Sequence, residues 1–387
     1  MAGSRSLTAS LPRFLALYSA LFAGFGVASP FVPELLASKG LEPRGISVVL
    51  ASGTAIRLLA GPAGGRFADR SGRPRLVLVE LLIAASFITL GYGAADTFAL
   101  LLLASVLQAS ALASVNPIAD ALTLYAARVN AFEYGWVRSA GSAAFIIGTV
   151  LSGLAIGRYS PNVIIWLSAA LLFAAALLTL ALPSNALLAP GRVAGGMLAL
   201  RHIPWFGRLM LVAALVEGSH ALHDAFAVIR WRGAGISPSI AGLLWSESVV
   251  AEIVVFAWLG PALLRQLGTG GASALAASAG VLRWGVMART AWLPAMALIE
   301  PLHGLTFALL HLACMRLMGR FVPPHLAATA QAFYMTVAVG ATTALLTLVA
   351  GSLYQTFGAT SFWAMAVLCA AALPPAVSLR AAETARI

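Results

Sequence analysis

The sequence predicts an all-α membrane protein in which twelve transmembrane helices form two six-helix bundles. Of its 387 residues, 60% are hydrophobic and 10% are charged, whereas a soluble domain has roughly 25% charged residues. Its mean hydropathy is +0.92, and apolar runs of roughly 20 residues, enough helix to cross about 30 Å of hydrocarbon, recur along the chain. Because backbone groups in lipid must satisfy their own hydrogen bonds, we expect every span to be a helix.

The apolar runs are separated by short segments that contain polar residues, glycine or proline. The first run is too long for the apolar core of a cleavable signal peptide, and no cleavage-like site follows it, so we expect a retained span. The predicted spans are residues 12–36, 45–66, 75–94, 97–125, 135–157, 162–182, 206–229, 239–262, 271–290, 293–315, 325–350 and 358–379. In the fifth span, Gly141, Gly148 and Gly153 predict the close approach of neighbouring helices.

The widest polar interval divides the predicted spans into two sets of six. We therefore predict an N-terminal bundle of residues 1–183, a cytoplasmic linker of residues 184–204 and a C-terminal bundle of residues 205–387. A weak internal repeat supports this division, because residues 264–268 follow the eighth span as an arginine-rich segment follows the second.

The formal net charge of +11 would suggest a nucleic-acid partner in a soluble protein, but here it is an orientation signal. Most of the 24 Lys and Arg residues fall in segments that, by the positive-inside rule, place both termini in the cytoplasm. We expect a monomer that crosses a bacterial-type inner (plasma) membrane several times and has no nucleic-acid partner. Both cysteines lie in apolar segments, and no motif predicts a cofactor or a metal site.

Residues 65–75, Gly-Arg-Phe-Ala-Asp-Arg-Ser-Gly-Arg-Pro-Arg, lie between the second and third spans. We expect a short loop in which Gly65 and Gly72 allow the tight turn and Asp69 lies among cations, where it can bridge helix ends. The pattern resembles the hallmark loop after the second helix of major facilitator transporters, which implies that fold and a conformational gating role for these residues with Arg70 and Arg73. A generic positive-inside loop is the alternative.

Ionisable side chains inside the spans cost roughly 2.5–3.5 kcal/mol each near mid-bilayer and therefore indicate a polar path. They are Arg57, Glu80, Asp120, Arg138, Glu217, Asp224, Glu247, Glu252, Arg283 and Glu300, with His220, His223, His303 and His311. Asp120 and Arg138 lie on consecutive spans, so an antiparallel hairpin brings them to a similar depth. Their separation, with Phe-Glu-Tyr-Gly at 132–135, resembles the lactose permease family, in which such a pair binds the substrate. A structural salt bridge is the alternative.

A closer resemblance is to the phenylpropionate permease family of facilitators, and it covers nearly the whole chain. It rests on residues 244–252, 281–285, 302–316 and 353–363, with shorter matches at 30–31 and 55–57. It implies proton-coupled uptake of an aromatic or other small carboxylate. Arg283 and His303 match the proton-coupling cluster of the lactose permease family, but Thr306 stands where that family has its proton-handling glutamate. Glu252 is the carboxylate best placed to replace it.

The seventh span departs from that family. Glu217, His220 and Asp224 are spaced i, i+3 and i+7 and share one helix face, with His223 to one side, which predicts a more polar substrate or a different coupling. A metal site at residues 220–224 is disfavoured. One face of the tenth span carries Glu300, His303, Phe307 and His311. These histidines are either a proton relay or only hydrogen-bonded helix contacts.

These patterns predict a secondary active transporter that carries a proton and a small organic anion, such as a phenylpropionate-like acid, into the cytoplasm by alternating access. Arg57, Arg138 and Arg283 are candidate partners of the anion, because a buried guanidinium stays charged and binds carboxylate bidentately. The substrate-binding set is completed by Asp120, His220 and His303, and the proton-coupling set is Glu252, Glu217, Asp224 and His303. A substrate carboxylate that competes for Arg283 would release Glu252 to bind a proton, which couples the two ligands.

Other classes of function stay open. One is proton symport of a neutral sugar or nucleoside, in which Asp120 and Arg138 bind hydroxyl groups. Another is a proton-antiporting exporter of hydrophobic drugs, although the buried arginines disfavour cationic drugs. A membrane enzyme is disfavoured because no nucleophile and base are paired, and a receptor would not need Asp120, Glu252 and Arg283 together.

Overall fold

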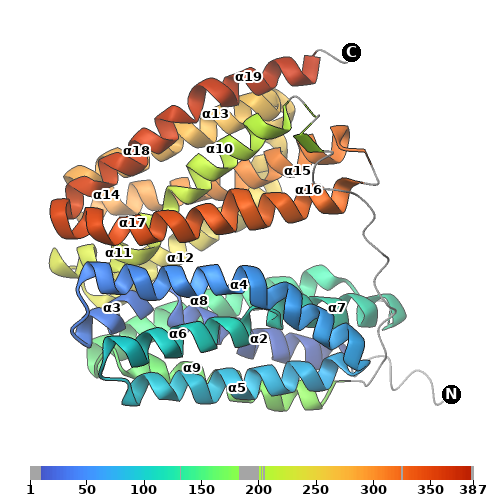
Figure 1. Cartoon of the computed structure of the whole chain (residues 1–387), viewed down its shortest axis with the longest axis vertical. Helices are drawn as coiled ribbons and strands as arrows, with labels where there is room; N and C mark the ends of the chain where they lie inside the picture. The colour runs from blue at the N-terminus through green and yellow to red at the C-terminus, as the bar shows by residue number, and fades with distance from the viewer. Residues whose placement is uncertain are drawn as a thin grey trace. The chain divides into compact units, whose positions relative to one another are not determined.

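The computed structural model describes residues 10–130, 132–182, 200–201, 203, 205–323 and 326–384, which form helices joined by short turns (Figure 1). Ten described segments are long and apolar enough to cross a membrane. Two of them, Pro238–Arg289 and Thr329–Leu379, have 52 and 51 residues, more than twice the roughly 20 that one crossing needs. The chain is thus an all-α, multi-pass membrane protein. The predicted linker, residues 184–204, lies almost entirely outside the described residues.

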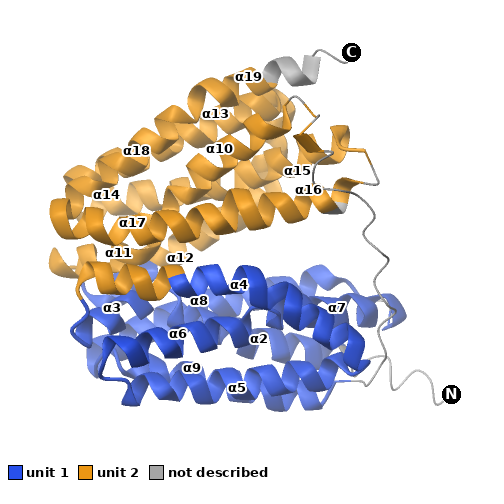
Figure 2. Ribbon diagram, viewed as in Figure 1, with its two compact units in different colours: residues 1–41, 52–191, 237–243 blue, residues 42–51, 192–236, 244–387 orange. Residues whose placement is uncertain are grey.

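The chain forms two compact units (Figure 2). Unit 1 contains residues 1–41, 52–191 and 237–243, and unit 2 contains residues 42–51, 192–236 and 244–387. The main helices of unit 1 are α2 (Ser10–Ala28), α3 (Val32–Ser38), α4 (Pro43–Ser71), α5 (Pro74–Ala94), α6 (Phe98–Leu112), α7 (Val115–Asn130), α8 (Tyr134–Arg158) and α9 (Val163–Leu180). The main helices of unit 2 are α10 (Phe206–Gly218), α11 (His220–Gly233), α12 (Pro238–Val254), α13 (Gly260–Arg289), α14 (Leu293–Ile299), α15 (Leu310–Phe321), α16 (Ala327–Phe333), α17 (Thr342–Phe357), α18 (Phe362–Ala371) and α19 (Leu373–Thr384). The first residues of α4 belong to unit 2 and those of α12 to unit 1.

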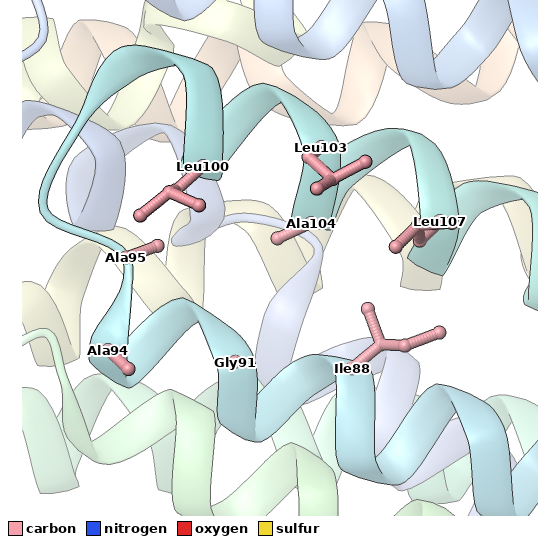
Figure 3. A pocket seen from close by; sticks show the side chains of 8 residues that line it. All are labelled: Ile88, Gly91, Ala94, Ala95, Leu100, Leu103, Ala104 and Leu107. Atoms are coloured by element: carbon pink, nitrogen blue, oxygen red, sulfur yellow. The ribbon is translucent and has the colours of Figure 1, made fainter.

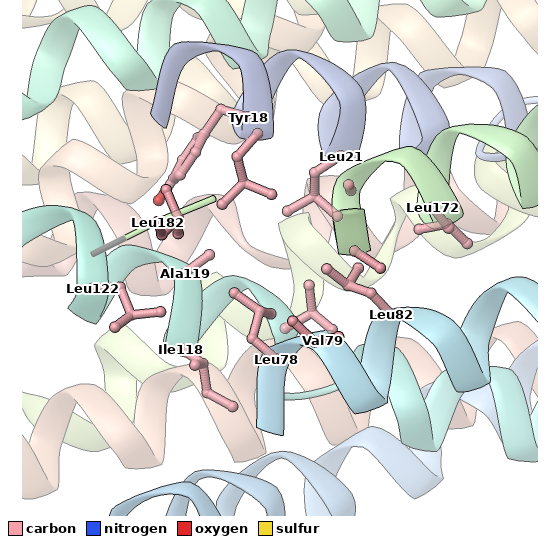
Figure 4. Packing of buried hydrophobic residues seen from close by; sticks show 14 of the residues in the cluster. Tyr18, Leu21, Leu78, Val79, Leu82, Ile118, Ala119, Leu122, Leu172 and Leu182 are labelled. Carbon is pink, nitrogen blue, oxygen red and sulfur yellow. The ribbon is translucent and has the colours of Figure 1, made fainter. Parts of the chain in front are cut away.

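Helix α2 is central to the packing of unit 1, where it contacts α8 and α9. Buried leucine, valine and alanine side chains from α2, α5, α7 and α9 form one core (Figure 4). A Cβ on Gly148 would overlap a backbone carbonyl of α2, and a Cβ on Gly26 would overlap one of α8. A Cβ on Gly141 or Gly153 would also come within 3.0 Å of a neighbouring helix. The predicted close approach at the glycines of the fifth span is confirmed.

The segment at residues 65–75 differs from the predicted loop. Helix α4 continues through Gly65 and ends at Ser71, because one glycine costs a helix only about 1 kcal/mol and the added residues gain backbone hydrogen bonds. The turn itself requires Gly72, whose φ is +62°, a value that favours glycine. Pro74 then begins α5, as proline does at a first helical position. One glycine rather than two makes the turn.

Interrupted helices are the main feature of unit 2. Ser219 separates α10 from α11, and Gly268, with φ of +66°, breaks α13 in the interval predicted to separate the eighth and ninth spans. Three π-helical segments, Val255–Leu259, Gly304–Leu309 and Tyr334–Ala341, follow α12, precede α15 and follow α16. Single-turn π segments often occur at functional sites.

A groove of about 290 Å³ lies between α5 and α6 of unit 1 (Figure 3). Its lining is Ile88, Gly91, Ala94, Ala95, Leu100, Leu103, Ala104 and Leu107. None of these side chains can donate or accept a hydrogen bond, and none is a predicted site residue. The groove suits hydrocarbon rather than a polar solute.

Candidate functional site

The best-connected polar cluster of unit 2 is centred on Arg283 in α13. The side chain of Arg283 is fully buried, and its Nη2 donates to Glu300 Oε2 at 2.6 Å. Its Nη1 donates to His303 Nδ1 at 3.0 Å, and its guanidinium carbon lies 4.6 Å from the ring centre of Trp284. The guanidinium therefore has a carboxylate, an imidazole and an aromatic face as partners.

Glu300 is as deeply buried as Arg283. Its Oε2 also accepts a hydrogen bond from Ser248 Oγ at 2.8 Å. His223 Nε2 lies 3.2 Å from this oxygen and 3.3 Å from Arg283 Nη2, so it either donates to the carboxylate or accepts from the guanidinium. Glu300 Oε1 has no hydrogen-bond partner among the described residues, which leaves one acceptor of a buried ion pair open.

His303 connects Arg283 to Glu252. Because His303 Nδ1 accepts from Arg283, the proton of the neutral ring must be on Nε2. His303 Nε2 then donates to Glu252 Oε1 at 2.8 Å. The result is a chain of polar contacts from Glu300 through Arg283 and His303 to Glu252, whose side chain is 21% exposed.

The predicted contact between Glu252 and Arg283 is therefore indirect, since His303 lies between them. The carboxylate that Arg283 binds directly is Glu300. Sequence reasoning placed Glu300 on the same face as His303 but did not pair it with Arg283. The sequence did hold a sign of this pairing. Arg283 and Glu300 lie on adjacent predicted spans, the span of Arg283 has no acidic residue, and the span of Glu300 has no lysine or arginine.

His223, which was expected to lie to one side of the face shared by Glu217, His220 and Asp224, is part of the Arg283 cluster. His223 contacts Glu300 and Arg283, stacks on Trp245 with ring centres 5.2 Å apart, and places Nδ1 3.4 Å from Asp224 Oδ1. The break at Ser219 separates Glu217 in α10 from His220, His223 and Asp224, which all lie in α11, so the i, i+3, i+7 rule, which assumes one continuous helix, does not apply across it.

The other members of the seventh-span group have distinct surroundings. His220 Nε2 lies 2.9 Å from Thr306 Oγ1, so the threonine at the position of the expected glutamate binds a histidine. Asp224 is 54% exposed. Glu217 is 5% exposed, and its Oε1 has no hydrogen-bond partner among the described residues.

The histidines of the tenth span do not form a continuous relay. Phe307 is stacked between them, with its ring centre 5.6 Å from that of His303 and 6.4 Å from that of His311. His311 Nδ1 instead lies 3.2 Å from Tyr334 Oη. Because a phenyl ring has no exchangeable proton, the two imidazoles belong to separate hydrogen-bond groups.

Unit 1 carries a second polar group, around Asp120 in α7. Asp120 Oδ1 accepts hydrogen bonds from Tyr18 Oη at 2.5 Å and from Tyr134 Oη at 2.9 Å. Arg138 forms no ion pair with Asp120 within the described residues. Its guanidinium carbon instead lies 4.5 Å from the ring centre of Phe22. The alternative of a structural Asp120–Arg138 salt bridge is not what this structure contains, and the side chain of Arg138 is exposed.

The remaining predicted residues make few contacts. Arg57 in α4 is exposed and has no hydrogen bond or ion pair to another described residue. The side chains of Asp69 and Arg70, in the last turn of α4, and of Arg73, just after it, are exposed, and the Asp69 carboxylate has no partner among the described residues. The described part of the chain contains no group of three side chains that could hold a metal ion.

Comparisons with known proteins agree with this architecture. Residues 11–365 match the MFS_1 like family. The chain is 32% identical over 380 residues to a "Probable 3-phenylpropionic acid transporter" of Escherichia coli (strain K12), a match that covers 93% of this chain and 96% of the relative. It is 26% identical over 349 residues to the maltose permease of Geobacillus stearothermophilus, covering 88% and 87%. The crystal structure of the nucleoside transporter NupG is similar in fold, with a TM-score of 0.85 over 96% of this chain and 98% of that one at 16% identity.

Proposed function

The chain belongs to the MFS_1 like family of membrane transporters, and from this premise we propose that it is a proton symporter of a small organic carboxylate. The first candidate is an aromatic acid of the phenylpropionate type, because the relative at 32% identity is described as a transporter of 3-phenylpropionic acid. Uptake into the cytoplasm, both termini in the cytoplasm and a bacterial inner membrane are parts of this proposal.

The observation that carries the proton coupling is the contact chain Glu300–Arg283–His303–Glu252. A proton on Glu252 would turn the acceptor of His303 Nε2 into a group that can also donate, and the change would pass through the single imidazole to Arg283. A ligand can shift an equilibrium only if its affinity differs between the two states. Through these contacts, the affinity of Glu252 for a proton would differ between a state in which His303 binds Glu252 and a state in which it does not.

The group that supports carboxylate binding is Arg138 in unit 1. Tyr18 and Tyr134 supply the hydrogen bonds of Asp120, and the exposed guanidinium of Arg138 has no ion pair with another described residue, so it is available to an anion. Arg57 is a second cation of the same unit, and it forms no ion pair within the part of the chain that the structure describes. Arg283 is less suited than the sequence indicated, because it is fully buried and bound to Glu300.

Twelve spans in two bundles are also proposed. The segments Pro238–Arg289 and Thr329–Leu379 each have the length of two crossings, and counting them twice raises ten spans to twelve. The break at Gly268 and the glycine at 358, with φ of +54°, are suitable turning points.

The test is uptake into proteoliposomes with 3-phenylpropionate, a sugar and a nucleoside under separate pH and voltage gradients. One monoanion moving with one proton carries no net charge, so we expect a pH gradient, worth about 1.4 kcal/mol per unit, to drive accumulation. A voltage alone, worth about 2.3 kcal/mol per elementary charge at 100 mV, should not. Accumulation of 3-phenylpropionate under voltage alone would contradict the one-to-one anion scheme.

A neutral sugar is the second candidate, since the chain is also similar to a maltose permease. Asp120 with its two tyrosine hydroxyls is a group that can bind sugar hydroxyls. In the same assay, pH-driven uptake of maltose but not of 3-phenylpropionate would favour this candidate. Efflux of a hydrophobic drug under the opposite gradient would favour the exporter.

A further inference from the structure

Asp120 and Arg138 of unit 1 are near neighbours that do not bind each other. Tyr134, the first residue of α8, donates a hydrogen bond to Asp120, and Arg138 is four residues farther along the same face of that helix. Arg138 is close enough to Tyr134 for its charge to act on this hydroxyl. Because helical side chains lean toward the N-terminal end of their helix, Arg138 is inclined toward the turn at which Tyr134 binds Asp120. An ion pair between the two charges is therefore within reach, yet the described part of unit 1 does not contain it.

Two tyrosine hydroxyls bind Asp120 in place of the arginine. Tyr18 of α2 donates to Oδ1 at 2.5 Å, and Tyr134 donates to the same oxygen at 2.9 Å. An ionised carboxylate can only accept and a hydroxyl has a single proton, so both protons are directed at Asp120. Tyr18 is fully buried, and the hydroxyl of Thr123 lies 3.3 Å from its own. The shorter of the two bonds therefore comes from a side chain that is enclosed on all sides.

The ring of Phe22 is the contact of Arg138. The guanidinium carbon lies 4.5 Å from the ring centre, within the range of a cation–π contact. Phe22 is buried and stacks on Tyr18, with ring centres 5.6 Å apart and planes inclined by 17°. Gly141 allows this ring to lie against α8, because a Cβ there would come 3.0 Å from a ring carbon of Phe22. Tyr18 thus binds Asp120 through its hydroxyl and supports the ring beside Arg138 through its own.

This arrangement keeps the arginine available. A carboxylate and a guanidinium attract each other strongly in a low-dielectric interior, so two neighbours stay apart only if other groups bind them. Arg138 contacts the face of Phe22 and forms no hydrogen bond or ion pair with another described residue. Its N–H groups, which can bind a carboxylate in pairs, therefore remain open to an anion from outside the chain.

We propose that Tyr18 is a positioning residue for Arg138, because it occupies Asp120 and supports Phe22 and so reserves the guanidinium for the carboxylate of the transported molecule. The inference rests on the proposed carboxylate transport and adds the residue that keeps the anion site open. Without the Tyr18 hydroxyl, Arg138 would pair with Asp120, and a substrate would have to break that ion pair before it could bind.

Tyr18→Phe tests the hydroxyl alone, because a phenyl ring can still stack on Phe22. Binding of 3-phenylpropionate to the purified full-length protein is measured by calorimetry. We expect the affinity to fall at least about tenfold, the factor that one hydrogen bond to a charged group provides. In an Asp120→Asn background, where no carboxylate competes for Arg138, the same change should leave the affinity nearly unaltered, which a loss of packing cannot explain. Tyr125→Phe, the same change at a half-buried tyrosine of α7, is the matched control and should bind like the wild type.

A stability cycle tests the inference without a substrate. In the wild type, the losses of melting temperature caused by Asp120→Asn and Arg138→Gln should add, because the two side chains are not paired. In Tyr18→Phe the double change should cost less than the sum, because each single change breaks the same new ion pair. If Tyr18→Phe does not fold, Tyr134→Phe, which removes the other hydroxyl, replaces it in both experiments.

Three results would overturn the inference: additive losses in both backgrounds, non-additive losses already in the wild type, or wild-type affinity in Tyr18→Phe. The proposed carboxylate transport fails separately. If the wild type does not bind 3-phenylpropionate but the losses become non-additive in Tyr18→Phe, transport of this acid is refuted and the role of Tyr18 in keeping Arg138 from Asp120 stands. If 3-phenylpropionate binds the wild type and Tyr18→Phe equally, the reverse holds.

Discussion

Arg283 and Glu300 form a salt bridge of 2.6 Å in which neither side chain is exposed. The two residues come from α13 and from the turn after α14, so the bridge joins two parts of unit 2. Removing one partner of a buried ion pair leaves the other charge uncompensated, which is more damaging than removing both.

We therefore expect Glu300→Gln to lower the free energy of unfolding by about 3–5 kcal/mol. The double variant Arg283→Gln with Glu300→Gln should recover part of that loss, because it leaves no lone charge. Thermal unfolding in detergent measures both, with Glu80→Gln as the control that should match the wild type. A single variant as stable as the wild type would show that the pair is open to water.

Arg138→Lys should weaken substrate binding severely although the charge is kept. Lysine lacks the planar guanidinium that grips a carboxylate with two hydrogen bonds and stacks over Phe22. Binding to the purified protein measures the change. Affinity like that of the wild type would remove Arg138 from the substrate site.

The exchanged pair, Asp120→Arg with Arg138→Asp, should not restore transport. In the structure Asp120 is bonded to Tyr18 and Tyr134 rather than to Arg138, and an arginine at 120 would face two hydroxyl groups in place of a charge. Uptake in proteoliposomes is the readout. Recovered transport would support a structural salt bridge.

The sequence was sufficient for the positions of several helices, because hydropathy depends on local composition alone. The third span was predicted at 75–94 and α5 is Pro74–Ala94. The fifth was predicted at 135–157 and α8 is Tyr134–Arg158. Gly65 was expected in a loop because glycine often marks a turn, whereas α4 continues past it to Ser71.

Pairings between helices were beyond the sequence, since they depend on how each helix is rotated about its axis. Arg283 and Glu300 are both visible as buried charges, yet no periodicity says that they face each other. The histidines of the seventh span are a second example. His220 and His223 lie in the same helix, α11, yet His223 contacts Glu300 and His220 contacts Thr306.

Glu252→Gln should abolish pH-driven accumulation but leave exchange of substrate across the membrane intact. Exchange needs no net proton movement, whereas accumulation requires a group that gains and loses a proton. The two assays run on the same proteoliposomes, with labelled substrate outside and either buffer or unlabelled substrate inside. Full pH-driven accumulation in Glu252→Gln would direct the search to Glu217, Asp224 and Glu300.

Asp69→Asn should slow transport and leave equilibrium binding unchanged. The Asp69 carboxylate has no partner among the residues that the structure describes, so its charge is available to pair with helix ends in another state of the cycle. Losing such an interaction shifts the equilibrium between states by about 1–2 kcal/mol. Turnover and calorimetric affinity are compared, and a large loss of affinity would be the contrary result.

Gly148→Ala should destabilise unit 1 by about 1–3 kcal/mol, the range for overpacking. Its Cβ would overlap a carbonyl of α2, whereas a Cβ on Gly91 has nothing within 4 Å. Gly91→Ala is therefore the matched control and should be neutral or slightly stabilising. Equal melting temperatures for the two variants would mean that α2 and α8 lie farther apart.

The stack of His303, Phe307 and His311 bears on whether protons can leak across the membrane through the protein. A chain of imidazoles along one helix would let protons fall across the membrane without carrying cargo. The phenyl ring of Phe307 interrupts such a path between His303 and His311, because it can neither accept nor donate a proton. In the proposed proton symporter, this interruption would keep protons from crossing along the tenth span when no substrate is bound.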